Sequence, residues 1–330
     1  MQPVITRYLS AADVTAAMPP VEERLALAER TMIALVADAE LPPKIGVHPR
    51  PTGSFAHAMP AALCDPDGTD LLGMKWVAGF PENRVSGLPA IHAVVILNDP
   101  LSGVPTAILD GGPITAQRTA AVSGVALASF GPRALDRPPR AAIIGAGVQG
   151  RSHLEVLGHV LPGVEVAIHD RHPDRAAALA GIARATAGIA AADAAASARD
   201  ATLDADVVVT AASFTSPEHR QAMTADWLAA HALVIPVDYA TMCAAEIASN
   251  AALFLVDDLG QFLVNREAGQ FDGYPEPVAT LGEAILAGTR RPAGGRVVVT
   301  HLGVGLADVI FADAIVRRAE AAGLGTALGA

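Results

Sequence analysis

The sequence predicts an α/β fold centred on a doubly wound parallel sheet. A short apolar run at 141–144 is followed by three glycines at G-x-G-x-x-G spacing, an amphipathic run at 151–161 and a second apolar run at 164–169. Further apolar runs follow along the chain, in the order expected of a parallel sheet. With 330 residues, 52% of them hydrophobic and 17% charged, the chain can bury a large core and is long enough for two domains.

The three glycines have separate physical roles in a turn that binds a dinucleotide. Gly145 permits a tight turn, Gly147 lets the backbone approach a pyrophosphate, and Gly150 lets the next helix pack on the strand. The amides that begin this helix attract phosphate oxygens. Asp170, directly after the second strand, stands where an acid binds a ribose 2′-hydroxyl. These features predict a Rossmann-type cofactor site, with an α/β turn that binds no phosphate as the alternative.

Asp170 favours NAD as the cofactor, because its charge repels the 2′-phosphate of NADP. Arg171 and Arg175 keep NADP open as an alternative, since either guanidinium could turn toward that phosphate. The residues expected to line the cofactor site are Thr119, Gly145, Gly147, Val148, Gln149, Gly150, Asp170, Arg171, Thr210, Ala211, Ala212, Ser213 and Val237.

Charge and cysteine content restrict the partners and the compartment. A formal net charge of −11 without a Lys/Arg cluster argues against nucleic acid and anionic membrane surfaces as partners. Cys64 and Cys243 are too few for a disulfide framework, and neither they nor the ten histidines show metal-ligand spacing. We therefore expect a cytoplasmic protein without a metal. The chain shows no signal-peptide pattern and no apolar run that predicts a membrane span.

The first part of the chain predicts strands and helices of a second region. A strand is expected at 4–8, a helix start at Ser10 and a packing helix at 21–39, where apolar residues recur at helical spacing. The proline-rich stretch 41–63 suits short strands joined by turns. Further strands are expected at 71–80, 90–99 and 104–110.

Two cations in this region point to a site. Lys75 lies inside an apolar strand, where an ammonium is costly unless it is paired or functional. It is either directed into a pocket or reaches solvent from a sheet edge. Arg118 is expected in the first turn of a helix at 114–130 with Thr115 as the N-cap, where the helix dipole disfavours a cation. Carboxylate capture would explain its position, and pairing with an internal Asp is the alternative.

The remainder of the chain continues the parallel sheet and then changes character. Near the C-terminus, the sequence predicts a strand, a turn at Gly303 and Gly305, and a helix with Gly323 as its C-cap. The segments expected after Arg118 are a linker at 132–140, a helix at 173–187, an Ala-rich stretch at 190–199, strands at 205–212, 232–237 and 253–256, and the final helix from about 306 to 322.

Motifs along nearly the whole chain resemble the ornithine cyclodeaminase/mu-crystallin family. ITAQRTAA, followed about twenty residues later by IIGAGVQG, is a more specific combination than the glycines alone. The matching segments are LPPK (41–44), HAMPA (57–61), GMKWVAGFPEN (73–83), AIHAVVIL (90–97), ITAQRTAA (114–121), IIGAGVQG (143–150), VVVTAAS (207–213), PVD (236–238) and HLGVGLAD (301–308).

The resemblance implies a homodimer that acts on a small α-amino or α-imino acid. Residues 1–130 and 300–330 would form an α+β domain for substrate binding and dimerisation, with a Rossmann domain at 131–299 inserted between them. Lys75, Arg118 and Lys44 match the cations that bind the α-carboxylate in the family. Asp238 matches the acid that moves protons on the substrate, so Lys75 and Asp238 would be the catalytic residues.

Three departures from the family bear on the substrate. His57 replaces a glutamate that holds the distal ammonium of ornithine in cyclodeaminases, and His92 stands where those enzymes have a threonine. The turn after Asp238 also differs from the family's Gly-Asp-x-Pro-Gly run. We expect His57 and His92 to line the far end of the substrate pocket and to favour a neutral or acidic distal group, while histidines filling a sheet core are the alternative.

The sequence thus predicts an NAD(P)-dependent imine reductase or amino-acid dehydrogenase. Two other functions stay open: a cyclodeaminase that releases ammonia from ornithine or lysine while NAD is recycled, and a non-catalytic binding protein regulated by a dinucleotide, like mu-crystallin. The absence of a glutamate at position 57 disfavours the first. The presence of Lys75, Arg118 and Asp238 disfavours the second, because cofactor binding alone needs none of them.

Overall fold

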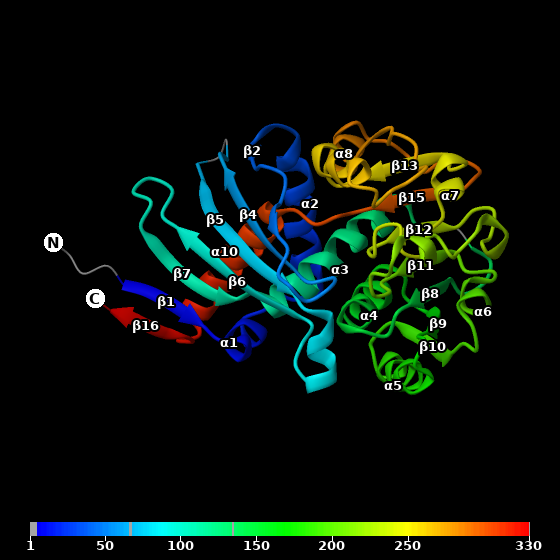
Figure 1. The fold of residues 1–330 in the computed structure, drawn as a ribbon, viewed down its shortest axis with the longest axis horizontal. Helices are drawn as coiled ribbons and strands as arrows, with labels where there is room; N and C mark the ends of the chain where they lie inside the picture. Colours follow the sequence, from blue (N-terminus) through cyan, green and yellow to red (C-terminus); the bar gives the residue numbers. More distant parts are fainter. Residues whose placement is uncertain (1–4, 66–67, 134, 330) are drawn as a thin grey trace. The chain divides into compact units, whose positions relative to one another are not determined.

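The computed structural model describes residues 5–65, 68–133 and 135–329. The chain forms two compact units (Figure 1): unit 1 is Met1–Arg118 with Gly303–Ala330, and unit 2 is Thr119–Leu302. The first division falls inside helix α3 (Gly111–Phe130), ahead of the break at 130 that the sequence suggested. Within the described ranges, none of the helices is both long and apolar enough to cross a bilayer.

Unit 1 is built on one eight-stranded sheet. Its strands are β1 (Ile5–Leu9), β2 (Ala39–Glu40), β3 (Ile45–Val47), β4 (Phe55–Leu63), β5 (Leu71–Gly79), β6 (Ile91–Asn98), β7 (Pro105–Asp110) and β16 (Thr326–Gly329). The order is β16-β1-β7-β6-β5-β4-β2, and β3 also pairs with β4. Neighbours are antiparallel except for β1 and β7. The strand expected at 4–8 corresponds to β1, and Val4 lies outside the described residues.

Three α-helices accompany this sheet: α1 (Ala11–Ala16), α2 (Val21–Ala37) and α10 (Gly305–Ala321). A capping box begins α1, in which the Ser10 side chain accepts from the Asp13 amide and the Asp13 carboxylate accepts from the Ser10 amide. Helix α10 packs against β4, β5 and β6, and α2 packs against α10. The helix behind these strands is visible in Figure 1. The C-terminal helix is therefore the central core element of unit 1.

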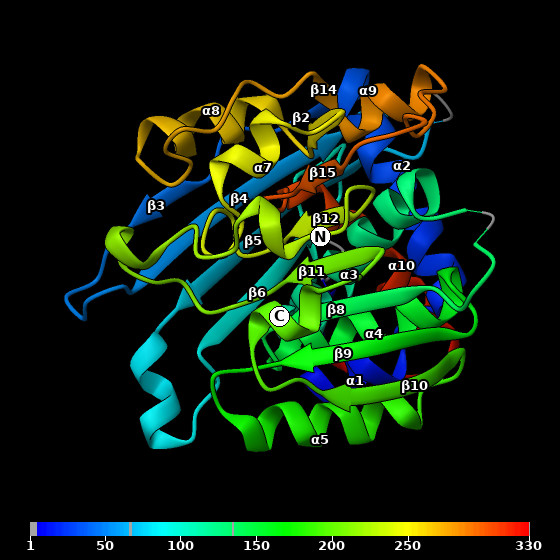
Figure 2. The ribbon, with the colours of Figure 1, turned by 90° about the vertical axis from the view of Figure 1, so that its right-hand side faces the viewer.

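Unit 2 contains an eight-stranded parallel sheet (Figure 2). Its strands are β8 (Arg140–Ile144), β9 (Val164–His169), β10 (Ile189–Ala194), β11 (Val207–Thr210), β12 (Leu233–Pro236), β13 (Leu253–Val256), β14 (Ala279–Thr280) and β15 (Val297–Thr300). The order is β10-β9-β8-β11-β12-β15-β13-β14, so successive strands leave β8 first to one side and then to the other. This is the doubly wound sheet that the sequence predicts, and its crevice for a ligand lies between β8 and β11.

The helices of unit 2 cover this sheet, whose central strands are buried throughout. They are α4 (Val148–Val160), α5 (Pro173–Arg184), α6 (Ala198–Thr202), α7 (Ala245–Ser249), α8 (Leu259–Glu267) and α9 (Leu281–Leu286). An aromatic group of Phe254, Phe262, Phe271 and Tyr274 packs together under α8. Aliphatic side chains fill most of the remaining core, as the low aromatic content predicts.

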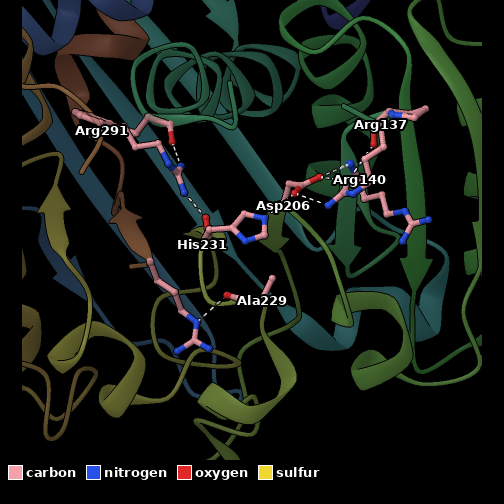
Figure 3. Close-up of polar contacts among 9 residues, drawn as sticks. Arg137, Arg140, Asp206, Ala229, His231 and Arg291 are labelled. Carbon is pink, nitrogen blue, oxygen red and sulfur yellow. Dashed lines mark hydrogen bonds and ion pairs between the residues drawn. The ribbon is translucent and has the colours of Figure 1, made fainter. Parts of the chain in front are cut away.

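A polar network joins the amino ends of β8 and β11, away from the crevice (Figure 3). The buried Asp206 carboxylate accepts two hydrogen bonds from Arg137, at 2.7 and 2.9 Å, and one from the Arg140 amide at 2.8 Å. His231 Nε2 lies 2.8 Å away, and Arg291 donates to the His231 carbonyl. Burial raises the pKa of Asp206, but the bonds from Arg137 and His231 outweigh it and leave the pKa below its usual value. The network is structural, because it satisfies a buried charge.

Two sequence expectations about local structure are wrong. Helix α3 begins at Gly111, where the Asp110 side chain accepts from the Gly112 amide at 2.8 Å, so Thr115 lies inside the helix and is not its N-cap. Arg118 therefore lies beyond the first turn, and the argument from the helix dipole does not apply to it. The Ala-rich stretch after 190, to which the sequence analysis assigned no element, contributes strand β10, because pairing with β9 overrides the helix preference of alanine.

Candidate functional site

Lys75 is buried on the face of the unit 1 sheet that α10 covers. It pairs with Met59 on one side and Val95 on the other, and its side chain is 1% exposed. A Cβ added to Gly73, on the same face, would lie 3.0 Å from Val309 in α10. The helix therefore lies close to the sheet at this point. The burial of Lys75 excludes a lysine that reaches solvent from a sheet edge.

Lys75 and Arg118 share one acidic partner, Asp308 in the first turn of α10. The Lys75 Nζ lies 2.7 Å from Asp308 Oδ2, and the Arg118 Nε lies 3.2 Å from Asp308 Oδ1. Thr115 Oγ1 is 3.5 Å from Nζ. Arg118 therefore pairs with an internal Asp, which was the alternative that the sequence left open. The sequence reasoning missed Asp308, although an acid in the first turn of an apolar helix was a signal for a buried counter-charge.

The ionisation of Lys75 is strongly perturbed. Burial lowers the pKa of Lys75 to about 7, while Asp308 raises it and the nearby Arg118 lowers it. A lysine near neutrality can bind an anion at low pH and exchange a proton at higher pH. This cluster suits the binding of a carboxylate, because it contains two cations and one anion.

His57 lies on the same sheet face as Lys75, since it pairs with Val77 two positions along β5. Its ring stacks on Phe55, with centroids 4.6 Å apart. Burial, followed by the charges of Lys44, His48 and Lys75, lowers the pKa of His57 to about 4, so the imidazole is neutral at pH 7. Lys44, in the segment between β2 and β3, is near enough for its charge to act on both His57 and Lys75.

His92 lies on the opposite face of the sheet. It pairs with Ala78, and strand alternation places Ala78 and His92 away from the side that carries Lys75 and Val77. The expectation that His57 and His92 line one pocket is therefore wrong for a single subunit. Of the five residues predicted to contact the substrate, unit 1 gathers Lys75, Arg118 and His57, with Lys44 close by.

Unit 2 carries the glycine turn at the carboxyl end of β8. Gly145 has φ +110, and a Cβ there would lie 2.3 Å from the Ala211 carbonyl oxygen. A Cβ on Gly150 would lie 2.1 Å from the Gly145 oxygen, whereas one on Gly147 would meet nothing within 4 Å. Gly147 is the N-cap of α4 and has no side chain that could bond the first amides of the helix. The turn fits a pyrophosphate, as the spacing predicts.

Asp170 supports this turn from the end of β9. Its carboxylate accepts from the Ala146 amide at 2.8 Å and from the His172 amide at 2.9 Å. The acid is thus held beside the glycine turn, where a ribose hydroxyl would bind. Arg171 and Arg175 are exposed nearby in sequence. Val148 and Gln149 begin α4, with Val148 exposed at the turn.

Asp238 follows β12 and is buried against the end of β11. Its Oδ1 accepts from the Thr210 hydroxyl at 2.7 Å, and its Oδ2 accepts from the Ala212 amide at 2.9 Å. Burial raises the pKa of Asp238 to about 7, although both hydrogen bonds oppose this. Tyr239, the next residue, has φ +60, a backbone conformation that is strained for residues other than glycine. A carboxyl group that titrates near pH 7 suits proton transfer.

Ala211 and Val237, which the sequence also predicts at the cofactor, lie where neighbouring strands end. Ala211 donates its amide to the Ile144 carbonyl at 2.7 Å, and Val237 donates to the Thr210 carbonyl at 2.8 Å, so β8, β11 and β12 end together. Ser213 is exposed after β11, and Thr119 is buried in α3.

A buried hydrogen-bond chain behind α4 was not predicted. Ser123 Oγ lies 2.8 Å from His301 Nε2 and 2.8 Å from His153 Nε2, and His153 Nδ1 lies 2.6 Å from the Gln149 carbonyl oxygen. Since a carbonyl only accepts, His153 carries its proton on Nδ1 and accepts at Nε2 from Ser123. Ser123 must then accept from His301. The chain fixes the first turn of α4.

Comparisons with known proteins agree with this arrangement. The profile of the ornithine cyclodeaminase/mu-crystallin family matches residues 7–321. The nodulation efficiency protein NfeD of Rhizobium meliloti is 34% identical over 325 residues, which cover 97% of each chain.

Two solved structures share the fold over the same extent. The Δ1-pyrroline-2-carboxylate reductase of Thermococcus litoralis, in complex with NADH and L-proline, is 26% identical with a TM-score of 0.83, and the match covers 97% of this chain and 99% of that one. An archaeal alanine dehydrogenase dimer with bound NAD is 25% identical with a TM-score of 0.84, over 98% and 99% of the two chains. Because the family profile spans all but the ends of the sequence, this chain belongs to the ornithine cyclodeaminase/mu-crystallin family.

Proposed function

We propose that this chain is an NAD(P)-dependent oxidoreductase that interconverts a small α-imino acid, or a 2-oxo acid plus an amine, and an L-amino acid. The observation that carries the proposal is the buried cluster of Lys75 and Arg118 around Asp308, which has one positive charge in excess and suits a single carboxylate. The dinucleotide turn of unit 2 supplies the second requirement. The similarity to a pyrroline-2-carboxylate reductase and to an alanine dehydrogenase supports the same reaction class.

Each residue has a defined task in this reaction. Lys75, Arg118 and Lys44 bind and orient the α-carboxylate, and the positive charge withdraws electron density from the C=N carbon. NADH, when bound, supplies the hydride. Asp238, protonated below pH 7, donates its proton toward the substrate nitrogen and takes it back in the reverse direction.

His57 limits the distal group of the substrate. The imidazole is neutral at pH 7 and has Lys44 and Lys75 as charged neighbours, so a distal ammonium would find no anion there. A neutral or acidic distal group fits these surroundings better. We therefore expect imino acids with a neutral or carboxylate end to be better substrates than ornithine and lysine.

The cofactor proposed is NAD, with NADP as the alternative. The glycine turn, the glycine N-cap of α4 and the position of Asp170 all fit a dinucleotide. An acid beside the turn favours a 2′-hydroxyl over a 2′-phosphate. Arg171 is exposed next to it and could pair with a phosphate.

The test is oxidation of NADH or NADPH, followed at 340 nm. The substrates are 2-oxo acids, including oxaloacetate and 2-oxoglutarate, each with ammonia or methylamine, and the cyclic imine pyrroline-2-carboxylate. We expect oxidation that requires both the oxo acid and the amine, or the imine alone. Release of ammonia from L-ornithine without net change in NADH would instead make the chain a cyclodeaminase and would refute the proposal.

We further propose that the chain forms a homodimer through unit 1. The sheet face opposite α10 is apolar: Trp76 is 42% exposed and pairs with Val94, which is 40% exposed, and Met74 pairs with Ile96 beside them. A second copy would cover this face, as an exposed apolar patch of this kind favours association. The archaeal alanine dehydrogenase is a dimer. Light scattering on the protein and on Trp76→Asp tests this, and a monomer in the unsubstituted protein would refute it.

Unit 1 is proposed as the substrate and dimer domain, and unit 2 as the cofactor domain. A cytoplasmic location is proposed on the free thiols, because Cys64 is exposed and unpaired and would be prone to oxidation in an oxidising compartment.

A further inference from the structure

Asp308 belongs to the HLGVGLAD segment, to which the proposed reaction assigns no role. It lies in the first turn of α10 and is 0% exposed. The Lys75 ammonium and the Arg118 guanidinium approach its two oxygens separately, at 2.7 and 3.2 Å. One carboxylate thus holds both cations in fixed positions relative to each other, and the positive end of the α10 dipole favours its ionised form.

The two glycines of the same segment allow this approach. Gly303 has φ +83, and a Cβ there would lie 2.4 Å from Arg118 Nη1. A Cβ on Gly305 would lie 2.4 Å from the Met59 carbonyl oxygen in β4. Any larger residue would push Arg118 or the start of α10 away from the sheet. The whole segment is therefore shaped to bring Asp308 to Lys75.

The charges that act on Lys75 come from several elements. Asp308 on α10 is the anion, while Arg118 on α3 and Lys44 before β3 are cations, and His57 on β4 is neutral at pH 7. Without Asp308, the Lys75 ammonium would be buried beside two like charges. It would then lose its proton, because an unpaired buried charge is costly.

We propose that Asp308 is a positioning residue, which keeps Lys75 protonated and aligned with Arg118 so that the substrate-free site presents one net positive charge to a monocarboxylate. This inference deepens the proposed function and rests on it for the identity of the ligand. Asp308 does not touch the reacting atoms; it acts through the two cations.

The direct test is the titration of Lys75. Lys44 and Lys75 are the two lysines of the sequence, so labelling with [ε-¹³C]lysine gives two NMR signals, and Lys75→Met assigns them. Asp308→Asn should move the Lys75 titration down by roughly one pH unit or more, which is the usual effect of removing an adjacent opposite charge. Asp313→Asn, on the same helix and paired with Arg317, is the matched control and should move neither signal.

The kinetic test separates positioning from general damage. In Asp308→Asn, the KM of the imino acid should rise about tenfold or more at pH 8, with a smaller change in kcat and in the KM of NADH. Lowering the pH to 6 should reduce the rise in KM, since a larger share of Lys75 is protonated in the variant at that pH. A rise in KM that is the same at both pH values would overturn the inference.

The outcomes distinguish the two proposals. If the unsubstituted protein oxidises no NADH with any imino acid, the proposed function fails, and the Lys75 titration still decides the role of Asp308. If Asp308→Asn does not fold, Lys75→Met with Asp308→Asn should recover folding in part, because the buried Lys75 ammonium is gone and only the Arg118 pairing is lost. A double variant that also fails to fold, or an unchanged Lys75 titration in the single variant, refutes a role that acts through Lys75.

Discussion

Replacing Asp238 with Asn removes a buried carboxyl group and retains its shape. The amide can keep both contacts, because its oxygen can accept from the Ala212 amide and its NH₂ can donate to the Thr210 hydroxyl, the partners at 2.9 and 2.7 Å. The variant is therefore expected to fold normally. Its effects should come from the lost proton and the lost charge.

The magnitude for stability follows from the pKa of Asp238, which burial raises from 3.8 to about 7. A group whose folded pKa is raised contributes stability below its unfolded pKa, and this contribution is lost as the pH rises through the folded pKa. At 1.36 kcal/mol per pKa unit, the ionised carboxylate costs the fold about 4 kcal/mol above pH 7. About 3 kcal/mol of that difference develops between pH 5 and pH 8. Asp238→Asn escapes this cost.

The assay is urea unfolding at pH 5 and pH 8, read from the fluorescence of Trp227 in unit 2. A Trp76→Phe background removes the other tryptophan, which lies in unit 1. The free energy of unfolding of the variant, relative to the parent, should rise by about 3 kcal/mol from pH 5 to pH 8. The kcat for imine reduction should fall by about 10²- to 10⁴-fold. A stability difference that is equal at both pH values would refute the raised pKa, and an unchanged kcat would refute the proton-transfer role.

Three other substitutions test the remaining assignments. Asp170→Ser should raise the ratio of kcat/KM for NADPH to that for NADH by roughly tenfold, because the repulsion of a 2′-phosphate is gone; a constant ratio means that the acid does not face the ribose. His57→Glu should weaken acidic substrates and improve cationic ones in the 340 nm assay, and an unchanged preference contradicts its contact with the distal group. Gly150→Ala should weaken NADH binding, measured by fluorescence titration, by about tenfold or more, since its Cβ would lie 2.1 Å from the Gly145 oxygen. The control Gly181→Ala, whose Cβ would meet nothing within 4 Å, should bind NADH normally.

Features with local causes could be predicted from the sequence. The glycine turn depends on backbone conformation and close contacts within a few residues, so its spacing, together with the apolar and amphipathic runs around it, located β8, α4 and β9. The apolar run at 253–256 became β13 with the same ends. The start of α3 also has a local cause, because Asp110 followed by two glycines is a signal for a helix start. The sequence analysis chose Thr115 as the N-cap and did not use this signal.

Features that depend on distant pairing could not be predicted in this way. The Ala-rich β10 is a strand only because β9 offers it an edge. Lys75 needed a counter-charge, but its sequence neighbours do not identify Asp308, which the fold brings from the C-terminal helix. The buried lysine predicted that a partner exists, and only the packing of α10 on β5 identifies it.

The two histidines show most clearly where sequence reasoning stops. Alternation within β6 predicts that His92 shares a face with Val94, and alternation within β5 puts Lys75 and Val77 on one face. Whether those faces coincide depends on the register between the strands, and a shift of one residue would exchange the two sides. The observed pairing of Ala78 with His92 puts His92 on the apolar outer face, whereas the pairing of Val77 with His57 puts His57 beside Lys75. Substitution of His57 should therefore change the substrate preference of a single subunit. Substitution of His92 could act on the substrate only across the outer face, where a second copy is proposed to bind.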